Sequence, residues 1–311
     1  MAKIESIVGH EIFDAQGNKA VQVLVTTTAG TQGLTIALVS DVQTALHSIA
    51  TEIQAALLGR DTIDQRGLDR KLLELNAVSS QQKIGLATLH AVSCATARSE
   101  AIRQGLPFYL YIKQLFPKRP LLLPIPSMTM LERHDGLLRQ CVLIPQAVTM
   151  LPEAIEMGRR VYQAISKNTE IQHSASIDTI FSILTHAAEQ EGFTPGKDLL
   201  WGIRLHGKEV DELYRTSRER YSAVKLDTEV ILKASSLGTI TETLQIILQA
   251  QEAKKVVGIT TAEDIAVVDI AVATGVAHIQ LGIPRHAENI MHYNRLLTIY
   301  TETSAPLWYT N

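Results

Sequence analysis

Lys233 is the residue whose type and position most directly predict chemistry in this chain. It follows the apolar run Val230–Leu232 and precedes a turn. A lysine amine can act as a base when burial or a nearby cation lowers its pKa, and Arg204 is a cation that could do so. A structural lysine, paired with Glu209 or Glu263, fits the same sequence, so both interpretations stay open.

Three further residues are candidates for contact with a substrate. Arg204 and His206 lie at the end of the predicted strand Leu199–Leu205, and ligands bind at strand ends when strands and helices alternate. We therefore expect these two residues to bind an anion. His134 is a candidate catalytic residue in a predicted loop, where a histidine without a catalytic role is the alternative.

Other catalytic and cofactor motifs are missing from the sequence. None of the 10 histidines has metal-ligand spacing to another His, Cys or carboxylate, and there is no GxSxG, P-loop or GxGxxG. We therefore predict no metal site. Cys94 and Cys141 are far apart in apolar surroundings, which predicts buried free thiols and a reducing, cytoplasmic location.

The composition is typical of a soluble globular protein. The chain has 311 residues, 46% of them hydrophobic and 20% charged, with a formal net charge of −3. A slightly acidic chain with interspersed charges predicts no nucleic-acid partner. The longest apolar stretch, Ile265–Ile283, is interrupted by Asp269 and His278, which predicts no membrane insertion.

The N-terminal part predicts three strands followed by three helices. The strands are expected at Ile4–Phe13, Ala20–Thr28 and Leu34–Val39, because apolar residues alternate there and the turn cluster Asp14–Asn18 separates the first two. The expected helices run from about Leu46 to Gly59, over Ile63–Leu75 and over Gln81–Gln104. Such an order indicates an α+β domain at 1–115.

Beyond a proline-rich boundary at Pro117–Pro126, strands and helices alternate. This order predicts a parallel sheet covered by helices in a second domain at 116–311. Two strands are expected first, then helices at Leu151–Ser166 and Asp178–Gly192, and a polar helix at Glu209–Tyr221. The six predicted strands are 121–128, 139–145, 199–205, 228–233, 255–259 and 277–281.

Seven stretches resemble motifs of the enolase family in the same order. For example, Lys83–Ala97 reads KIGLATLHAVSCATA, where the family reads KLGANAILGVSLAVA. The stretches are 10–18, 61–76, 83–97, 105–112, 230–239, 264–274 and 293–299. The resemblance implies an α/β fold with an N-terminal α+β domain and a reduced βα barrel of the TIM type. Six strands against the usual eight mean that about two are missing.

The resemblance also assigns roles to site residues. In the family, the lysine at the position of Lys233 removes a proton from the substrate beside magnesium held by three carboxylates. Arg204 stands at the position of the first carboxylate, and residues 209–225 contain no counterpart of the other two. Gln140 and Gln280 replace a glutamate and a lysine of the family's site.

Other family features are changed as well. The mobile loop that supplies a serine is missing, since Ser40 runs directly into Asp41 and a helix. His134 aligns with the histidine of the family's GGSHA motif. Because the metal ligands are replaced, the comparison implies that magnesium binding is lost and that no cofactor is bound.

The expected function is that of an enolase-like pseudoenzyme with a structural, regulatory or assembly role through protein–protein contacts. We expect a homodimer or a hetero-oligomer with another protein, although Gln16 replaces an arginine of the family's dimer contact. A repurposed lyase or isomerase that uses Lys233 as base is the alternative, and would be a carbon–oxygen lyase. Ordinary conversion of 2-phosphoglycerate to phosphoenolpyruvate is the least expected outcome.

Overall fold

The computed structural model describes residues 1–14, 16–78, 84–133, 138–146, 148–168, 171, 176–205, 223–225, 230–261 and 264–308. Its contacts define two compact units. Unit 1 comprises Met1–Leu121, Leu232–Lys254 and Ile259–Thr274, and unit 2 comprises Leu122–Ile231, Lys255–Gly258 and Gly275–Asn311. The predicted division into two consecutive domains at 115/116 stays a prediction, because each of these units is built from three separate segments of the chain.

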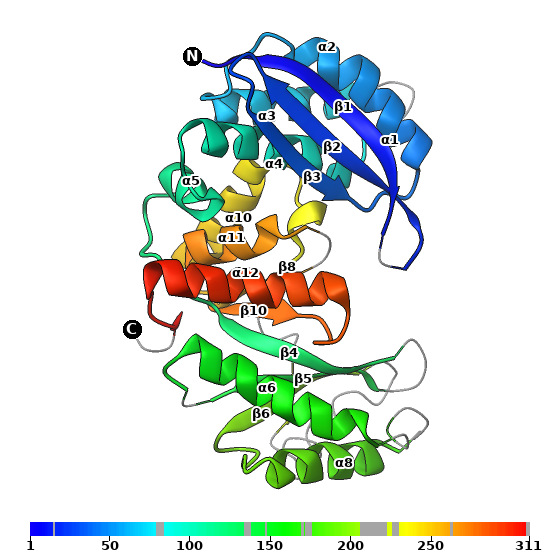
Figure 1. The fold of residues 1–311 in the computed structure, drawn as a ribbon, viewed down its shortest axis with the longest axis vertical. Helices are drawn as coiled ribbons and strands as arrows, with labels where there is room; N and C mark the ends of the chain where they lie inside the picture. The colour runs from blue at the N-terminus through cyan, green and yellow to red at the C-terminus, as the bar shows by residue number, and fades with distance from the viewer. Residues whose placement is uncertain are drawn as a thin grey trace. The chain divides into compact units, whose positions relative to one another are not determined.

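Unit 1 begins with an antiparallel sheet of three strands (Figure 1). They are β1 (Ile4–Phe13), β2 (Lys19–Thr27) and β3 (Gln32–Ala37), close to the predicted positions. The Asp14 side chain accepts a hydrogen bond from the Asn18 amide at 2.7 Å, which closes the predicted turn between β1 and β2. The N-terminal part of the fold prediction is therefore confirmed.

Helices cover the inner face of this sheet. The first is a continuous segment of α1 (Val42–Ser48), a π-helical turn η1 (Ile49–Ile53) and α2 (Gln54–Leu57). It ends shortly before Gly59, whose φ of 75° favours a residue without a side chain. α3 (Gln65–Val78) and α4 (Leu86–Arg103) follow as predicted, and α5 (Phe108–Leu115) is a helix that the sequence analysis missed.

The core of unit 1 lies between the sheet and these helices. Val21, Val23 and Val25 of β2 are fully buried, and they alternate with residues that stay partly accessible. Ile49, Ile53 and other apolar residues of the helical layer pack against them. Alternation by two in the strand and by three or four in the helices produces this core.

Unit 2 contains most of a seven-stranded sheet with the order β7-β6-β5-β4-β10-β9-β8. The order is linear, so the sheet is an open half-barrel in the described part of the chain. The strands are β4 (Ile125–Glu132), β5 (Leu138–Pro145), β6 (Leu199–Leu205), β7 (Ala223–Lys225), β8 (Val230–Leu232), β9 (Val257–Thr260) and β10 (His278–Leu281).

Two details of the predicted sheet were wrong. The described chain has seven strands after the boundary rather than six, because β7 was not predicted. The sheet is also mixed: β5 runs antiparallel to both β4 and β6, whereas β10 is parallel to β4. Alternating elements predicted parallel neighbours, but only five residues separate β4 from β5, and so short a connection joins antiparallel strands.

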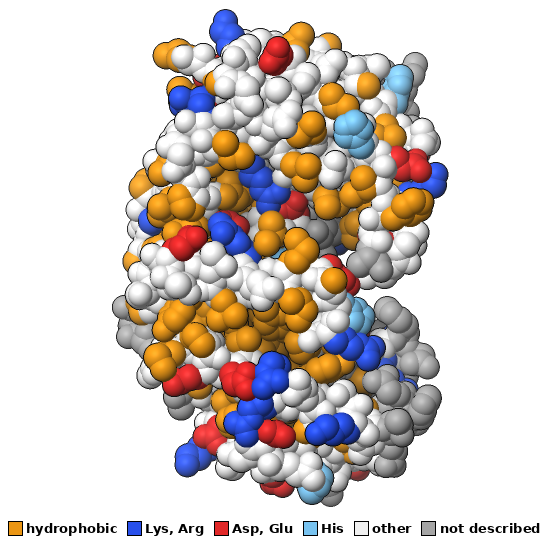
Figure 2. Space-filling model, in the orientation of Figure 1, with side chains coloured by type: hydrophobic (Ala, Val, Ile, Leu, Met, Phe, Trp, Pro, Cys, Tyr) orange, Lys and Arg blue, Asp and Glu red, His pale blue; other side chains and the backbone are white. Residues whose placement is uncertain are grey.

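The described helices of unit 2 include α6 (Leu151–Ser166), α8 (Ile177–Gln190) and α12 (Ala287–Thr303), while α10 (Ile240–Glu252) and α11 (Ala266–Thr274) belong to unit 1. α6 packs on β4, where Gly158 leaves room for the Met128 side chain. The predicted polar helix at 209–221 lies outside the described residues. Acidic and basic side chains are interspersed on the face in Figure 2. No described helix is long and apolar enough to cross a membrane.

Candidate functional site

Lys233 lines a cavity of about 460 Å³ in unit 1. It directly follows β8 and precedes a short 3-10 helix at Ala234–Ser236, and its side chain is exposed. The position at a strand end was predicted from the apolar run before it. A lysine in a cavity of this size can reach a small molecule, since ligand sites commonly enclose about 300–1,000 Å³.

One wall of this cavity is the short connection between β3 and α1. Asp41 caps α1, and its carboxylate accepts hydrogen bonds from the Thr44 amide at 3.1 Å and the Thr44 hydroxyl at 2.6 Å. The hydrogen bond from the Thr44 hydroxyl is the largest cause that lowers the pKa of Asp41. The predicted direct passage from Ser40 into a helix is therefore confirmed.

The lining of this cavity is rich in hydroxyl groups. Residues 84–88 contribute the start of α4, whose N-terminal cap, Gly85, has no side chain to bond the first amides. Six hydroxyl side chains line the cavity: Ser40, Thr44, Ser48, Thr88, Ser235 and Ser236. Apart from the Thr44 hydroxyl, which already donates to Asp41, these groups and Lys233 can donate hydrogen bonds to a polar molecule. Among the described lining residues the one carboxylate, Asp41, already caps a helix.

Arg204 lies in unit 2, on β6, directly opposite Gln140 of β5 in the antiparallel register. Gln140 is 7% exposed, and its Nε2 lies 3.5 Å from the Thr129 hydroxyl of β4. Its Oε1 is buried and has no hydrogen-bond partner among the described residues. Gln280 of β10 pairs with Ser127 of β4.

Strands β10, β4 and β5 therefore carry buried neutral groups, namely the amides of Gln280 and Gln140 and the hydroxyls of Ser127 and Thr129. The next strand, β6, carries the guanidinium of Arg204. Magnesium does not fit the guanidinium of Arg204. Its preferred ligands are carboxylate and carbonyl oxygens in an octahedron, and a guanidinium is a permanent cation without an acceptor atom. In the described part of the chain, no three His, Cys, Asp or Glu side chains are grouped so that they could hold a metal ion. No reaction step through magnesium can be built on Arg204 and Gln140.

The predicted site residues are not united in one described site. Lys233 belongs to unit 1 and Arg204 to unit 2. His134 and His206 lie outside the described residues, as do Glu209 and Glu263. The catalytic pair Lys233 and His134, and the anion pair Arg204 and His206, therefore stay predictions.

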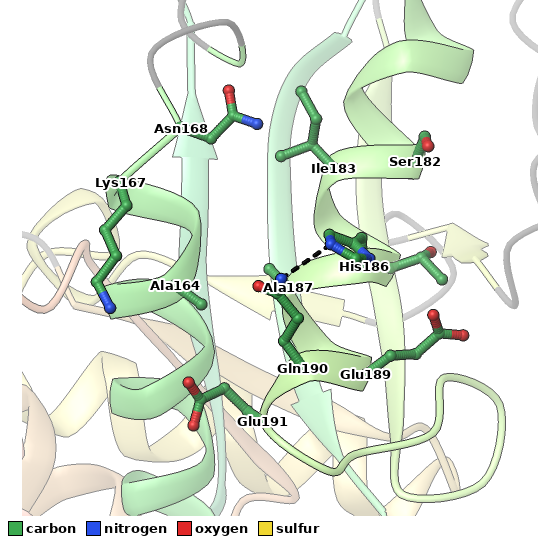
Figure 3. Close-up of a pocket in the computed structure, with 11 residues that line it drawn as sticks. Ala164, Lys167, Asn168, Ser182, Ile183, His186, Ala187, Glu189, Gln190 and Glu191 are labelled. Atoms are coloured by element: carbon green, nitrogen blue, oxygen red, sulfur yellow. Dashed lines mark hydrogen bonds between the residues drawn. The ribbon is translucent and has the colours of Figure 1, made fainter.

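Sequence reasoning missed a larger, open cavity of about 1010 Å³ between α6 and α8 (Figure 3). Lys167 and Asn168 approach it from the end of α6, and Ser182, His186 and Glu189 from α8. A side-chain nitrogen of Gln190 lies 2.9 Å from His186 Nε2. In the sequence, this cavity is indicated only by the helical spacing of these α8 residues. The same spacing is typical of any helix face that is exposed to solvent.

Comparisons with known proteins agree with this architecture. Residues 35–112 match the family described as enolase, N-terminal domain, and residues 210–310 match the enolase, C-terminal TIM barrel domain. The chain is also similar to Enolase 1 of Methanospirillum hungatei JF-1, with 22% identity over 420 aligned positions that cover 99% of this chain and 98% of that protein. An alignment of 420 positions against 311 residues leaves at least 109 positions empty in this chain. The chain is a divergent member of the enolase family.

Proposed function

We propose that this protein is a non-catalytic member of the enolase family, located in the cytoplasm, with a structural, regulatory or assembly role through protein–protein contacts. The observation that carries the proposal is the register of β5 and β6, which places Gln140 opposite Arg204. By the resemblance, these positions correspond to a glutamate and to a metal-binding aspartate of the family.

The electrostatic consequence is large. Removing a proton next to a carboxylate creates a dianion, and the family uses magnesium to stabilise that charge. A pair made of an amide and a guanidinium holds no divalent cation. Without that stabilisation, a lysine cannot remove so weakly acidic a proton at a useful rate.

The test of lost enolase activity is a direct assay. The purified protein, magnesium and 2-phosphoglycerate are expected to give no phosphoenolpyruvate, with an active enolase as the positive control. Turnover of even about 1 per second, which is low among enzymes, would show that the metal site is present after all.

The open sheet supports a role in protein–protein contacts. β7 and β8 are the two edge strands of the described sheet. The amides and carbonyls along the outer side of an edge strand commonly pair with another chain or are covered by it. Figure 2 shows hydrophobic side chains gathered between α12 and α6. Among the residues of unit 2, Met150 is 44% and Met291 55% exposed. Exposed apolar surface of this kind is typical of contact sites.

Light scattering of the pure protein separates the possible assemblies. A mass of twice the chain supports a homodimer. A monomer that gains mass only when a second protein is added supports a hetero-oligomer, and mass spectrometry of material isolated from the native cell identifies that protein. A monomer with no bound protein in either experiment would contradict the proposed role.

A repurposed lyase or isomerase is the second candidate, because Lys233 lines a cavity with six hydroxyl side chains. Its test is exchange of carbon-bound hydrogen with deuterium in heavy water, across a panel of carboxylic and phosphorylated acids. Exchange that is lost in Lys233→Ala but kept in Lys255→Ala, an exposed lysine outside the cavity lining, would favour this candidate. No exchange with any acid would count against it.

A further inference from the structure

A separate, small cavity of about 160 Å³ lies in unit 1 between α3, the end of α5 and α10. Its apolar wall is made by Leu115, Phe116, Leu244 and Leu248. Phe116 is 5% and Leu244 6% exposed, so these two side chains form the base of the cavity. A cavity of about 150 Å³ lined by such side chains holds one benzene-sized group.

Hydrogen bonds fix the walls of this cavity before anything binds. Asp69 of α3 accepts hydrogen bonds from the Thr241 amide at 3.0 Å and the Thr241 hydroxyl at 2.6 Å, which holds α10 against α3. The start of α10 is fixed by a capping box between Thr239 and Glu242. A preformed cavity loses little conformational freedom on binding, which favours small ligands.

The charges that line the cavity are both positive. They belong to Arg66 of α3 and Lys118, which follows α5, and no carboxylate lines it in the described part of the chain. Lys118 forms an ion pair with Glu252 at 3.6 Å, but both side chains are more than half exposed. Such a surface pair contributes little energy, so an incoming anion can compete with Glu252 for the lysine.

We propose that this cavity binds a small organic acid that combines one ring-sized apolar group with a carboxylate. The apolar group occupies the space over Phe116 and Leu244, and the carboxylate contacts Arg66 and Lys118. Arginine suits this role because its planar guanidinium can donate two parallel hydrogen bonds to a carboxylate. The cavity is separate from the one that Lys233 lines, so this proposal does not depend on the proposed function.

The probe is 3-phenylpropionate, titrated into the whole protein and followed by the shifts of backbone amides in NMR spectra. The neutral 3-phenylpropanamide and the cationic 3-phenylpropylamine have similar apolar parts and serve as controls. We expect the acid to bind up to about fivefold more tightly than the amide, because an ion pair with exposed side chains contributes up to about 1 kcal/mol. The amine is expected to bind more weakly than the amide.

Three variants locate the site. Gln245→Trp, at an exposed residue of the lining, is expected to fill the cavity mouth and abolish binding of all three probes. The double variant Arg66→Gln/Lys118→Gln is expected to remove the preference for the acid. Arg70→Gln, an exposed charge of α3 outside the lining, is the matched control and should bind the acid like the wild type.

Several results would overturn the proposal. One is that the protein binds the acid and the amide with equal affinity. Another is that Gln245→Trp binds the acid as the wild type does. A third is that the wild type shows no saturable binding of the acid. Amide spectra of each unliganded variant show whether it is folded. Should Gln245→Trp not fold, the double variant and the comparison of acid with amide decide the question on their own.

Discussion

Arg98 of α4 and Asp264, which precedes α11, form a two-pronged ion pair within unit 1 across 166 positions of sequence. The Arg98 Nη1 atom lies 3.1 Å from Asp264 Oδ2, and the side chains are only 16% and 12% exposed. Asp264 also accepts a hydrogen bond from the Ile36 amide of β3 at 3.0 Å. One carboxylate thereby joins the N-terminal sheet, α4 and a segment from the second half of the chain.

Removing this carboxylate is expected to destabilise the protein strongly. Asp264→Ala leaves the Arg98 guanidinium largely buried without its partner, which costs about 3–5 kcal/mol of unfolding free energy. Urea denaturation measures the change. Glu74→Ala is the control, because Glu74 pairs with Lys71 at the surface, where the Glu74 side chain is 54% exposed. This control variant should change the unfolding free energy by less than about 0.5 kcal/mol. If the effects of Arg98→Met and Asp264→Ala simply add in the double variant, the pair is not coupled.

Glu100 is expected to make stability depend on acidic pH. Burial alone would raise its pKa, but hydrogen bonds from Arg103, Thr62 and Gln104 outweigh burial and lower the pKa below its ordinary value of 4.5. Because the pKa of Glu100 is lower in the folded than in the unfolded protein, its contribution to stability is complete above pH 4.5. That contribution is lost as the pH falls through the pKa of the folded state. Urea midpoints should therefore fall less steeply with acidification in Glu100→Gln than in the wild type. Equal slopes would contradict this assignment.

Gly33 marks the closest approach of β3 to α4. A Cβ atom built at this position would lie 1.9 Å from the carbonyl oxygen of Ala95 and 2.6 Å from the amide nitrogen of Ser99, which are backbone atoms that cannot turn away. Gly33→Ala should therefore force β3 and α4 apart and lower the unfolding free energy by more than about 2 kcal/mol. Gly85→Ala is the matched control, since its nearest neighbour is 4.0 Å away, and its melting temperature should stay near that of the wild type.

The Thr241 hydroxyl is expected to contribute to stability through Asp69. Asp69 is 1% exposed, and Ser93 and Gln65 donate to it in addition to Thr241. Thr241→Val removes one donor to a buried carboxylate and should cost about 1–3 kcal/mol. Thr301→Val is the comparison, because the exposed Thr301 hydroxyl only bonds the Leu297 carbonyl of its own helix. A similar loss in both variants would show that Asp69 does not depend on Thr241.

Magnesium is expected to leave the melting temperature unchanged, with or without 2-phosphoglycerate. An ion that binds only the folded protein raises its stability by mass action, so a resident site would be visible in this measurement. EDTA should likewise have no effect. A rise in melting temperature that saturates with magnesium would contradict the proposed loss of the metal site. The double variant Arg204→Asp/Gln140→Glu shows whether two carboxylates at these positions make the melting temperature depend on magnesium.

The sequence by itself determined the elements and the family. Local patterns were sufficient for β1, α6 and β6, whose observed bounds agree with the predicted ones, because alternation and helical spacing are visible in short windows. The short passage from Ser40 to Asp41 was predicted from the resemblance, because the loop that the family carries there is missing. α5 (Phe108–Leu115) was missed, because its short apolar run directly follows a proline and was assigned to no helix or strand.

Tertiary structure alone decided which distant segments meet. The pairing of Gln140 with Arg204 depends on strand order and register, and the ion pair of Arg98 with Asp264 joins residues far apart in the chain. The same holds for the cavity between Arg66, Lys118 and Leu244. Hydrophobic periodicity records which face of an element is buried, but the neighbour on that face is chosen by packing among all elements at once, which no local pattern contains.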